Sequence, residues 1–249
     1  MKLHIVVPTI MTNPNQEFNC LKELADSFNQ AKLDYTIYFV SNTELPEFNN
    51  YIPYNNNIKK SISNLNFNIS RAINSVYECI KFEDDDILGF IQSDTFFSNK
   101  NWILDYIDVL QDKNLNAGII GARPHSGSNV IHDYISYNGK FQLCKVLWAD
   151  GVMLFRGKVF RDTNGFDEGF FGDCESQDFC YRVHHLGYNN YWCSDDNRYF
   201  GYVNRSTDFN SKARYNKDEF KKRVDESHEY WKKKWYDFEM KTIGRSSQS

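Results

Sequence analysis

The chain has 249 residues, 41% of them hydrophobic and 16% aromatic, and its 29 basic and 33 acidic residues give a formal net charge of -4. This length is sufficient for one large α/β domain whose core needs neither a metal nor a disulfide bond. The negative charge argues against a protein that wraps nucleic acid, because neutralising phosphates requires a broad basic surface.

The cysteines and the apolar runs indicate in which cellular compartment the protein resides. Six cysteines are present without a C-x-x-C pair, which is typical of reduced, mostly buried thiols in a cytosolic protein. The apolar run at the N-terminus is too short for a signal peptide, and no run reaches the ~20 residues of a membrane helix. We therefore expect a soluble, cytoplasmic protein.

Strand and helix patterns alternate along the chain. Continuous apolar, β-branched runs predict buried strands at 3–7, 35–40, 87–91, 117–121 and 152–155. Apolar residues at helical spacing predict helices at 21–28, 69–80 and 101–110. This alternation predicts an α/β fold with a Rossmann-like, doubly wound, mostly parallel sheet, in which ligands bind beyond the carboxyl ends of the strands.

Two segments depart from this alternation. Between 123 and 145 the periodicity fades, which predicts a substrate-facing excursion that could take the form of an antiparallel hairpin. From Lys217 onward a helical stripe is formed by Phe220, Val224, Trp231, Trp235 and Phe238. The stripe predicts a tail helix that packs on the catalytic domain, with a peripheral membrane or oligomer contact through 217–240 as the alternative. We divide the chain into a domain at 1–212 and a C-terminal amphipathic helix with a disordered tail at 213–249.

Three segments in the second half follow one another in an informative order. Residues 148–156 read WADGVMLFR, residues 165–168 read GFDE, and residues 175–182 read ESQDFCYR. Their order and spacing resemble the acceptor side of family 2 glycosyltransferases, in which a Gly-Phe-Asp-Glu turn precedes a Glu-Asp-x-Asp helix. Three ordered elements arise by chance much less readily than one. The resemblance covers about residues 3 to 203. It implies a GT-A fold and an inverting hexosyltransferase that moves a sugar from a nucleotide-sugar donor to an acceptor hydroxyl.

The resemblance also assigns a donor side. Asp94 stands at the position where members of the family bind a divalent cation, Mn or Mg, and the diphosphate. In the structural alternative, Asp94 caps the turn that leads to Trp102. Arg71 would oppose the diphosphate and Asn74 would bind ribose or sugar, unless their helix is simply amphipathic with a solvated arginine. The base would lie against the first two strand ends, with a UDP-sugar as the default donor. The expected donor-binding residues are Pro8, Thr9, Ser41, Asn42, Arg71, Asn74, Gln92, Ser93 and Asp94, with Asp94 also the metal ligand.

On the acceptor side, the family's general base aligns with Ser176, which has no carboxylate. Glu175 is therefore the preferred base, with Asp178 and Asp173 as substitutes, because each could reach an acceptor hydroxyl from a helix N-terminus. An alternative makes Ser176 the N-cap and pairs Asp178 with Arg182 at i+4. The expected acceptor-binding residues are Trp148, Asp150, Gly151, Asp167 and Glu168. Trp148 could equally belong to the core, and the last two residues fit a turn.

Two other function classes compete with transfer. One is a non-catalytic nucleotide-sugar or carbohydrate-binding module on a degenerate GT-A fold. The other is a nucleotidyltransferase, which is disfavoured because residues 8–13, PTIMTN, do not form a Gly-rich basic loop. The acceptor class stays open among glycan, lipid-linked, protein and small-molecule hydroxyls. Transfer requires Asp94 and the acidic segment around Glu175 to converge in space.

Overall fold

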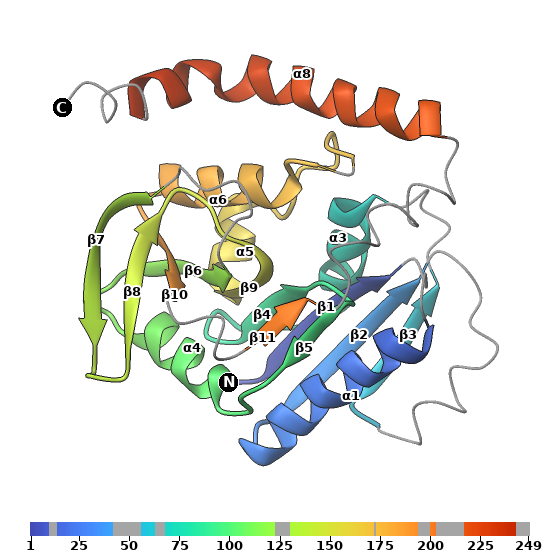
Figure 1. Cartoon of the computed structure of the whole chain (residues 1–249), viewed down its shortest axis with the longest axis vertical. Helices are drawn as coiled ribbons and strands as arrows, with labels where there is room; N and C mark the ends of the chain where they lie inside the picture. Colours follow the sequence, from blue (N-terminus) through green and yellow to red (C-terminus); the bar gives the residue numbers. More distant parts are fainter. Residues whose placement is uncertain are drawn as a thin grey trace.

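A computed structural model describes residues 1–9, 14–41, 56–62, 68–122, 130–171, 173–193, 200–202 and 217–242. A nine-stranded mixed sheet forms the centre of the molecule, with strand order β3-β2-β1-β4-β9-β6-β10-β8-β7. Figure 1 shows this sheet between two groups of helices. A small second sheet pairs β5 (Thr95–Phe97) with β11 (Phe200–Tyr202) in antiparallel fashion.

The N-terminal half of the sheet is parallel. Its strands are β1 (Leu3–Thr9), β2 (Tyr35–Ser41), β3 (Ile58–Ile62) and β4 (Ile87–Ile91). The predicted strands at 3–7, 35–40 and 87–91 are confirmed, and β4 is buried throughout. The edge strand β3 was not predicted, because its sequence IKKSI carries exposed lysines in place of an apolar run. Charged residues of this kind protect a sheet edge from pairing with another chain.

The C-terminal half of the sheet changes direction. Strand β9 (Asp150–Arg156) runs antiparallel to both β4 and β6 (Ala117–Ala122), and β10 (Asn189–Cys193) runs parallel to β6. Strands β7 (Val130–Tyr137) and β8 (Phe141–Val146) form the antiparallel hairpin expected after residue 123. Because β9 opposes β4, its first residues lie beside the carboxyl end of β4. This arrangement brings the two motif regions to one edge of the sheet.

Helices cover both faces of the sheet. On one face lie α1 (Pro14–Gln30) and α4 (Trp102–Gln111), whose Phe28 and Trp102 are fully buried in the first core cluster. On the other face lie α3 (Ile69–Cys79), α5 (Gly157–Thr163) and α6 (Glu175–His185), which build the second cluster around Phe155 and Phe179. The helices expected at 21–28, 69–80 and 101–110 are confirmed, whereas the seven-residue α5 was not predicted.

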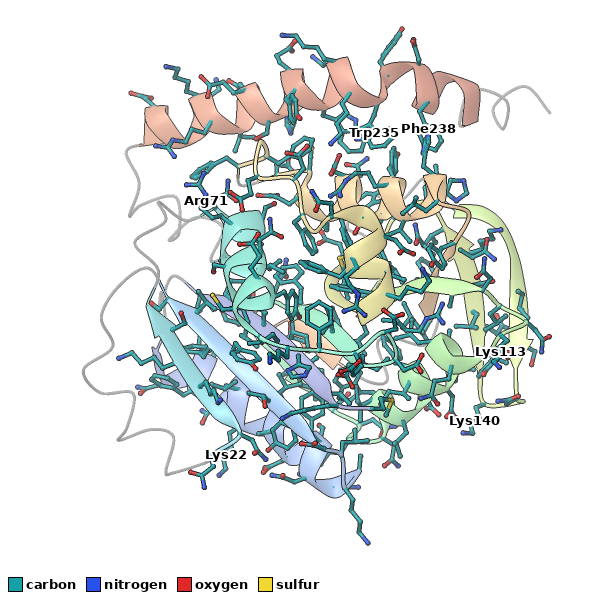
Figure 2. The ribbon with its side chains drawn as sticks, turned by 180° about the vertical axis from the view of Figure 1, so that it is seen from behind. Lys22, Arg71, Lys113, Lys140, Trp235 and Phe238 are labelled. Atoms are coloured by element: carbon teal, nitrogen blue, oxygen red, sulfur yellow. The ribbon has the colours of Figure 1, made fainter. Side chains whose placement is uncertain are left out.

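The C-terminal helix α8 (Lys217–Thr242) lies across α6, as Figure 1 shows. In Figure 2 the side chains of Trp235 and Phe238 point from α8 toward α6. Their rings lie 5.4 and 5.1 Å from the ring of Tyr181, and Trp231 lies 4.9 Å from it. The expectation that the aromatic stripe packs on the catalytic domain is therefore confirmed for Trp231, Trp235 and Phe238. The side chain of Phe220 and the end of the tail expected to be disordered lie outside the described residues.

The burial of the cysteines agrees with the sequence prediction, because Cys20, Cys144, Cys180 and Cys193 are buried. Among the helices that the structure describes, none is both long and apolar enough to cross a membrane.

Candidate active site

Several predicted donor residues share one edge of the sheet. The parallel register of β1 and β2 places Pro8 opposite Val40 and Thr9 opposite Ser41. Strand β4 runs parallel to β1 on its other side, so the segment after Ile91 emerges at the same edge. Thr9 and Ser41 are almost completely buried, at 1% and 0% exposure. Asn42 lies outside the described residues.

Asp94 lies in a turn directly after β4. The Thr95 N–H donates to the Gln92 carbonyl at 3.1 Å, and Asp94 within this turn is half-buried. The N-cap of α4 is Asn101, seven residues further along the chain, and the metal-binding role of Asp94 stays a prediction. Strand β11 returns beside this turn, with Tyr202 opposite Thr95.

Helix α1 contributes further carboxylates to the region of Asp94. Burial raises the pKa of Cys20 to about 12, and the negative charges of Glu23, Asp94 and Glu17 act in the same direction. Glu17 accepts a hydrogen bond from the Thr9 hydroxyl, and Glu23 accepts one from the Phe97 N–H at 3.1 Å. This strand edge is therefore rich in carboxylate oxygen. Glu17 was missed by sequence reasoning; its only signal was an acidic residue in the first turn of the helix that follows β1.

The donor and acceptor segments meet at the start of β9. The Gln92 N–H donates to the Gly151 carbonyl at 3.0 Å. The Ser176 hydroxyl donates to Oδ1 of Asp150 at 3.0 Å. The Asp94 turn and the first turn of α6, which are far apart in sequence, therefore both contact the Asp150-Gly151 dipeptide.

Helix α6 begins at Glu175, which is only 7% exposed. Its N-cap is Cys174, in the left-handed conformation with φ 70° and without a side-chain capping bond. The alternative that Ser176 is the N-cap is therefore wrong. Glu175, in the first turn, lies at the positive end of the helix dipole.

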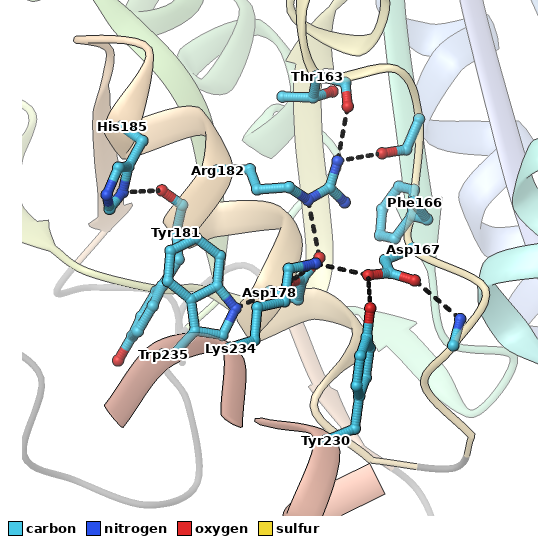
Figure 3. A network of polar contacts seen from close by, with 12 residues as sticks. Thr163, Phe166, Asp167, Asp178, Tyr181, Arg182, His185, Tyr230, Lys234 and Trp235 are labelled. Carbon is cyan, nitrogen blue, oxygen red and sulfur yellow. Dashed lines mark hydrogen bonds and ion pairs between the residues drawn. The ribbon is translucent and has the colours of Figure 1, made fainter. Parts of the chain in front are cut away.

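Asp178 is enclosed between α6 and α8, as Figure 3 shows. Its side chain has no solvent exposure. Arg182 Nε donates to Oδ2 at 2.8 Å, while Lys234 Nζ and Trp235 Nε1 each lie 2.8 Å from Oδ1. The expected i, i+4 pair with Arg182 is confirmed. The two donors from α8 were missed.

The turn after α5 is also held by α8. Oδ1 of Asp167 accepts the Gly169 N–H at 2.8 Å, and Oδ2 accepts hydrogen bonds from Lys234 and Tyr230. Burial alone would raise the pKa of Asp167, but these hydrogen bonds outweigh it and hold the pKa below the usual 3.8. Asp167 thus forms the turn predicted for it, and Lys234 bridges it to Asp178.

Arg71 and Asn74 lie against the same turn. Oδ1 of Asn74 accepts the Phe166 N–H at 2.8 Å, and its amide group donates to the Phe166 carbonyl at 2.8 Å and to Glu168 at 3.1 Å. Arg71 Nε is 2.9 Å from Oε2 of Glu168. In Figure 2, Arg71 extends from the N-terminal end of α3 toward this region. Arg71 is exposed and forms a surface ion pair with Glu168, so the alternative of a solvated arginine stays open, and the donor roles of both residues stay predictions.

Trp148 lies in the second core cluster and is 8% exposed. This placement agrees with the core alternative that its sequence left open. Asp150 beside it is half-buried and accepts the Ser176 hydroxyl. Of the expected acceptor residues, Asp150 and Gly151 therefore lie at the point where the two segments meet, and Glu168 lies on the turn held by α3.

Comparisons with known proteins bear on the fold. No family model matches the sequence, and no curated protein matches it at a significant level. The structure is similar to the catalytic domain of Drosophila beta1,4galactosyltransferase 7 in complex with xylobiose, with a TM-score of 0.54 and 13% identity. This match covers 82% of the present chain and 71% of the other.

Two further solved structures are similar. The mannosyltransferase PcManGT from Pyrobaculum calidifontis, in complex with GDP-Man and Mn2+, has a TM-score of 0.58 at 14% identity and covers 77% of this chain. GalNAc-T7 with UDP, GalNAc and Mn2+ has a TM-score of 0.59 at 10% identity and also covers 77%. The chain spans 55% of the first protein and 41% of the second. At these identities the likeness establishes the fold, and the chain has a GT-A glycosyltransferase-like fold, as its sequence predicts.

Proposed function

We propose that this chain is a nucleotide-sugar-dependent glycosyltransferase that inverts the anomeric centre. The observation that carries the proposal is the meeting of two segments at Asp150 and Gly151, one containing Asp94 and the other beginning with Glu175. Transfer needs a group that holds the diphosphate and a base for the acceptor hydroxyl on adjoining parts of one site. The GT-A likeness supports the same reaction class.

On the donor side, Asp94 would hold a divalent cation together with the diphosphate. The surroundings fit a hard ion such as Mn or Mg, because Glu17 and Glu23 on α1 add further carboxylates in this region and the nearby Cys20 thiol stays protonated. Such an ion supplies charge neutralisation for the departing diphosphate. The similar structures of PcManGT and GalNAc-T7 contain GDP-Man and UDP, respectively, each with Mn2+. Thr9 and Ser41 would face the nucleoside, with a UDP-sugar as the default donor.

On the acceptor side, Glu175 would accept the proton of the attacking hydroxyl. The acceptor oxygen then bonds to the anomeric carbon from the face opposite the nucleoside diphosphate, which leaves with the former bonding electrons. Glu175 is well suited because it is mostly buried at a helix N-terminus, next to the meeting point of the two segments. Asp173 is the second candidate.

The enclosed carboxylate of Asp178 is better suited to positioning than to proton transfer. It has no exposed surface and already accepts hydrogen bonds from Arg182 and Trp235. Asn74 would likewise position the turn at Phe166, because its side-chain oxygen and nitrogen are both hydrogen-bonded to the Phe166 backbone. Glu168 and Asp150 would contact the acceptor hydroxyl, which belongs to a glycan, a lipid-linked sugar, a protein or a small molecule.

The test separates donor binding from transfer. A panel of nucleotide sugars is incubated with the full chain, with and without Mn2+, and nucleoside diphosphate release and thermal shift are measured. Asp94→Asn should abolish the donor-induced thermal shift, whereas Glu175→Gln should keep the shift and lose turnover. Glu78→Gln, an exposed carboxylate on α3, is the matched control and should behave as wild type. Equal loss of binding in both site variants would show that this division of roles is wrong.

A non-catalytic binding module is the second candidate function. It is favoured by Ser176, which occupies the expected base position and whose hydroxyl is bonded to Asp150. A saturable thermal shift with one nucleotide sugar, without release of nucleoside diphosphate from any donor or acceptor mixture, would establish the module and exclude the enzyme.

A further inference from the structure

A cluster of three different ligand types lies outside the proposed donor site. It consists of the Asp173 carboxylate, the Cys174 thiol and the His228 imidazole, whose ligand atoms all lie within 4.8 Å of one another. Asp173 and Cys174 directly precede α6, whereas His228 belongs to α8. The contact between Asp173 and His228 joins positions 55 residues apart in sequence.

We propose that Asp173, Cys174 and His228 form a zinc site that joins α8 to the segment preceding Glu175. Zn²⁺ prefers sulfur and nitrogen ligands with a carboxylate, at about 2.3 Å for sulfur and about 2.0–2.2 Å for nitrogen and oxygen. Ligand atoms on such a tetrahedron are about 3.3–3.6 Å apart, so the present separations require only small side-chain movements. A thiolate and a carboxylate together balance the charge of the ion.

The site is held by bonds that do not involve its ligand atoms. On α8, the Ser227 hydroxyl accepts the Phe171 N–H at 2.8 Å and donates to the Phe171 carbonyl at 3.1 Å. These bonds fix the position of α8 one residue before His228. On the other segment, Oδ1 of Asp173 accepts the Cys174 N–H at 2.8 Å, which leaves Oδ2 directed to His228 at 2.7 Å. Ligands whose orientation is already fixed bind a metal with less loss of entropy.

The exposure of the cluster fits a metal that enters from solvent. The side chains of His228 and Asp173 are 47% and 52% exposed, so a fourth position is open to water. An ion pair needs only the carboxylate and the imidazole, whereas the thiol completes a set that selects Zn²⁺ over the hard ions suited to Asp94. The two sites therefore differ in the metal that they take, and this proposal does not depend on glycosyl transfer.

The experiment uses Co²⁺ as a spectroscopic substitute for Zn²⁺ on the full chain after treatment with a chelator. A thiolate bound to Co²⁺ gives a charge-transfer absorption in the near ultraviolet, and Zn²⁺ added afterwards should abolish it while Mn²⁺ should not. Cys174→Ser should lose the band. Asp173→Asn and His228→Gln should weaken Co²⁺ binding by more than tenfold, because even outer-shell partners contribute about 10- to 100-fold to metal affinity.

Two controls separate this site from other thiols and from the donor side. Cys79→Ser removes an exposed thiol on α3 and should keep the band, and Asp94→Asn should keep it as well. Zn²⁺ should raise the melting temperature of wild type and of Cys79→Ser but not of Cys174→Ser. Absence of the band in wild type, or its persistence in Cys174→Ser, would overturn the proposal whether or not the chain transfers sugar.

Discussion

Replacing Lys234 by Met tests whether α8 is needed to hold the buried Asp178. Asp178 has no exposed surface, and Lys234 Nζ lies 2.8 Å from its Oδ1. Removing one partner of a buried ion pair costs about 3–5 kcal/mol when the remaining charge is left without compensation. Arg182 and Trp235 continue to donate to Asp178, so we expect Lys234→Met to lower the free energy of unfolding by about 2–3 kcal/mol.

The assay is urea unfolding, followed by far-ultraviolet circular dichroism. Lys233→Met is the matched control, because Lys233 is the adjacent residue on the exposed face of α8, where substitutions usually change stability by less than about 0.5 kcal/mol. A double-mutant cycle with Asp178→Asn should give a coupling energy of about 1–3 kcal/mol, since Asn no longer carries the charge that Lys234 balances. A Lys234→Met variant as stable as the Lys233→Met control would refute the assignment of Lys234 as the counter-ion.

Three further predictions concern single side chains. The folded-state pKa of Asp167 is below 3.8, so the stabilisation by its carboxylate is present above that pH and disappears as the pH falls through the folded pKa. The difference in free energy of unfolding between wild type and Asp167→Asn should therefore be largest at pH 7 and vanish in acid. A difference that does not change with pH would contradict this prediction. Burial, aided by nearby carboxylates, raises the pKa of Cys20 to about 12, so only about 10⁻⁴ of this thiol is ionised at pH 8. Iodoacetamide should therefore label Cys20 far more slowly than the exposed Cys79. Equal labelling rates of the two cysteines in a peptide-mapping assay would contradict this prediction. Asn74→Ala should lower the urea midpoint by an amount equivalent to about 1–3 kcal/mol, because the buried Phe166 N–H loses its acceptor, and an unchanged midpoint would show that this bond is dispensable.

The strands of the parallel half could be predicted because both of their faces are buried. A strand that is covered on both sides must be apolar at every position, and β1 and β4 show this pattern clearly. The edge strand β3 lacks it, since exposed Lys59 and Lys60 occupy its middle. Helix α5 was missed because its seven residues are too few to show a helical period after the apolar run of β9.

The motif segments of the site could be predicted, but the contacts of several residues could not. The position of Asp94 after a buried strand and the acidic start of α6 were visible in the sequence. Asn74 was expected to face the donor, yet its amide is bonded to a turn 92 residues away, a pairing that no local pattern encodes. Lys234 offered a usable signal, because it lies three residues after Trp231 and four before Phe238 and so shares the inward face of α8.

The inward face of α8 also bears on the two interpretations of this helix. Trp231 and Trp235 are only 8% and 7% exposed because they pack on Tyr181 of α6. A helix that lies on a membrane surface inserts its apolar face into lipid, so α8 would have to leave α6 first. That movement would expose the rings and remove two donors from the fully buried Asp178. The outer face of α8 is exposed to solvent and carries side chains of both charges, among them the ion pair of Lys232 and Glu229. We therefore infer that α8 acts as a structural part of the acceptor half, and that any membrane or oligomer contact uses its outer, charged face.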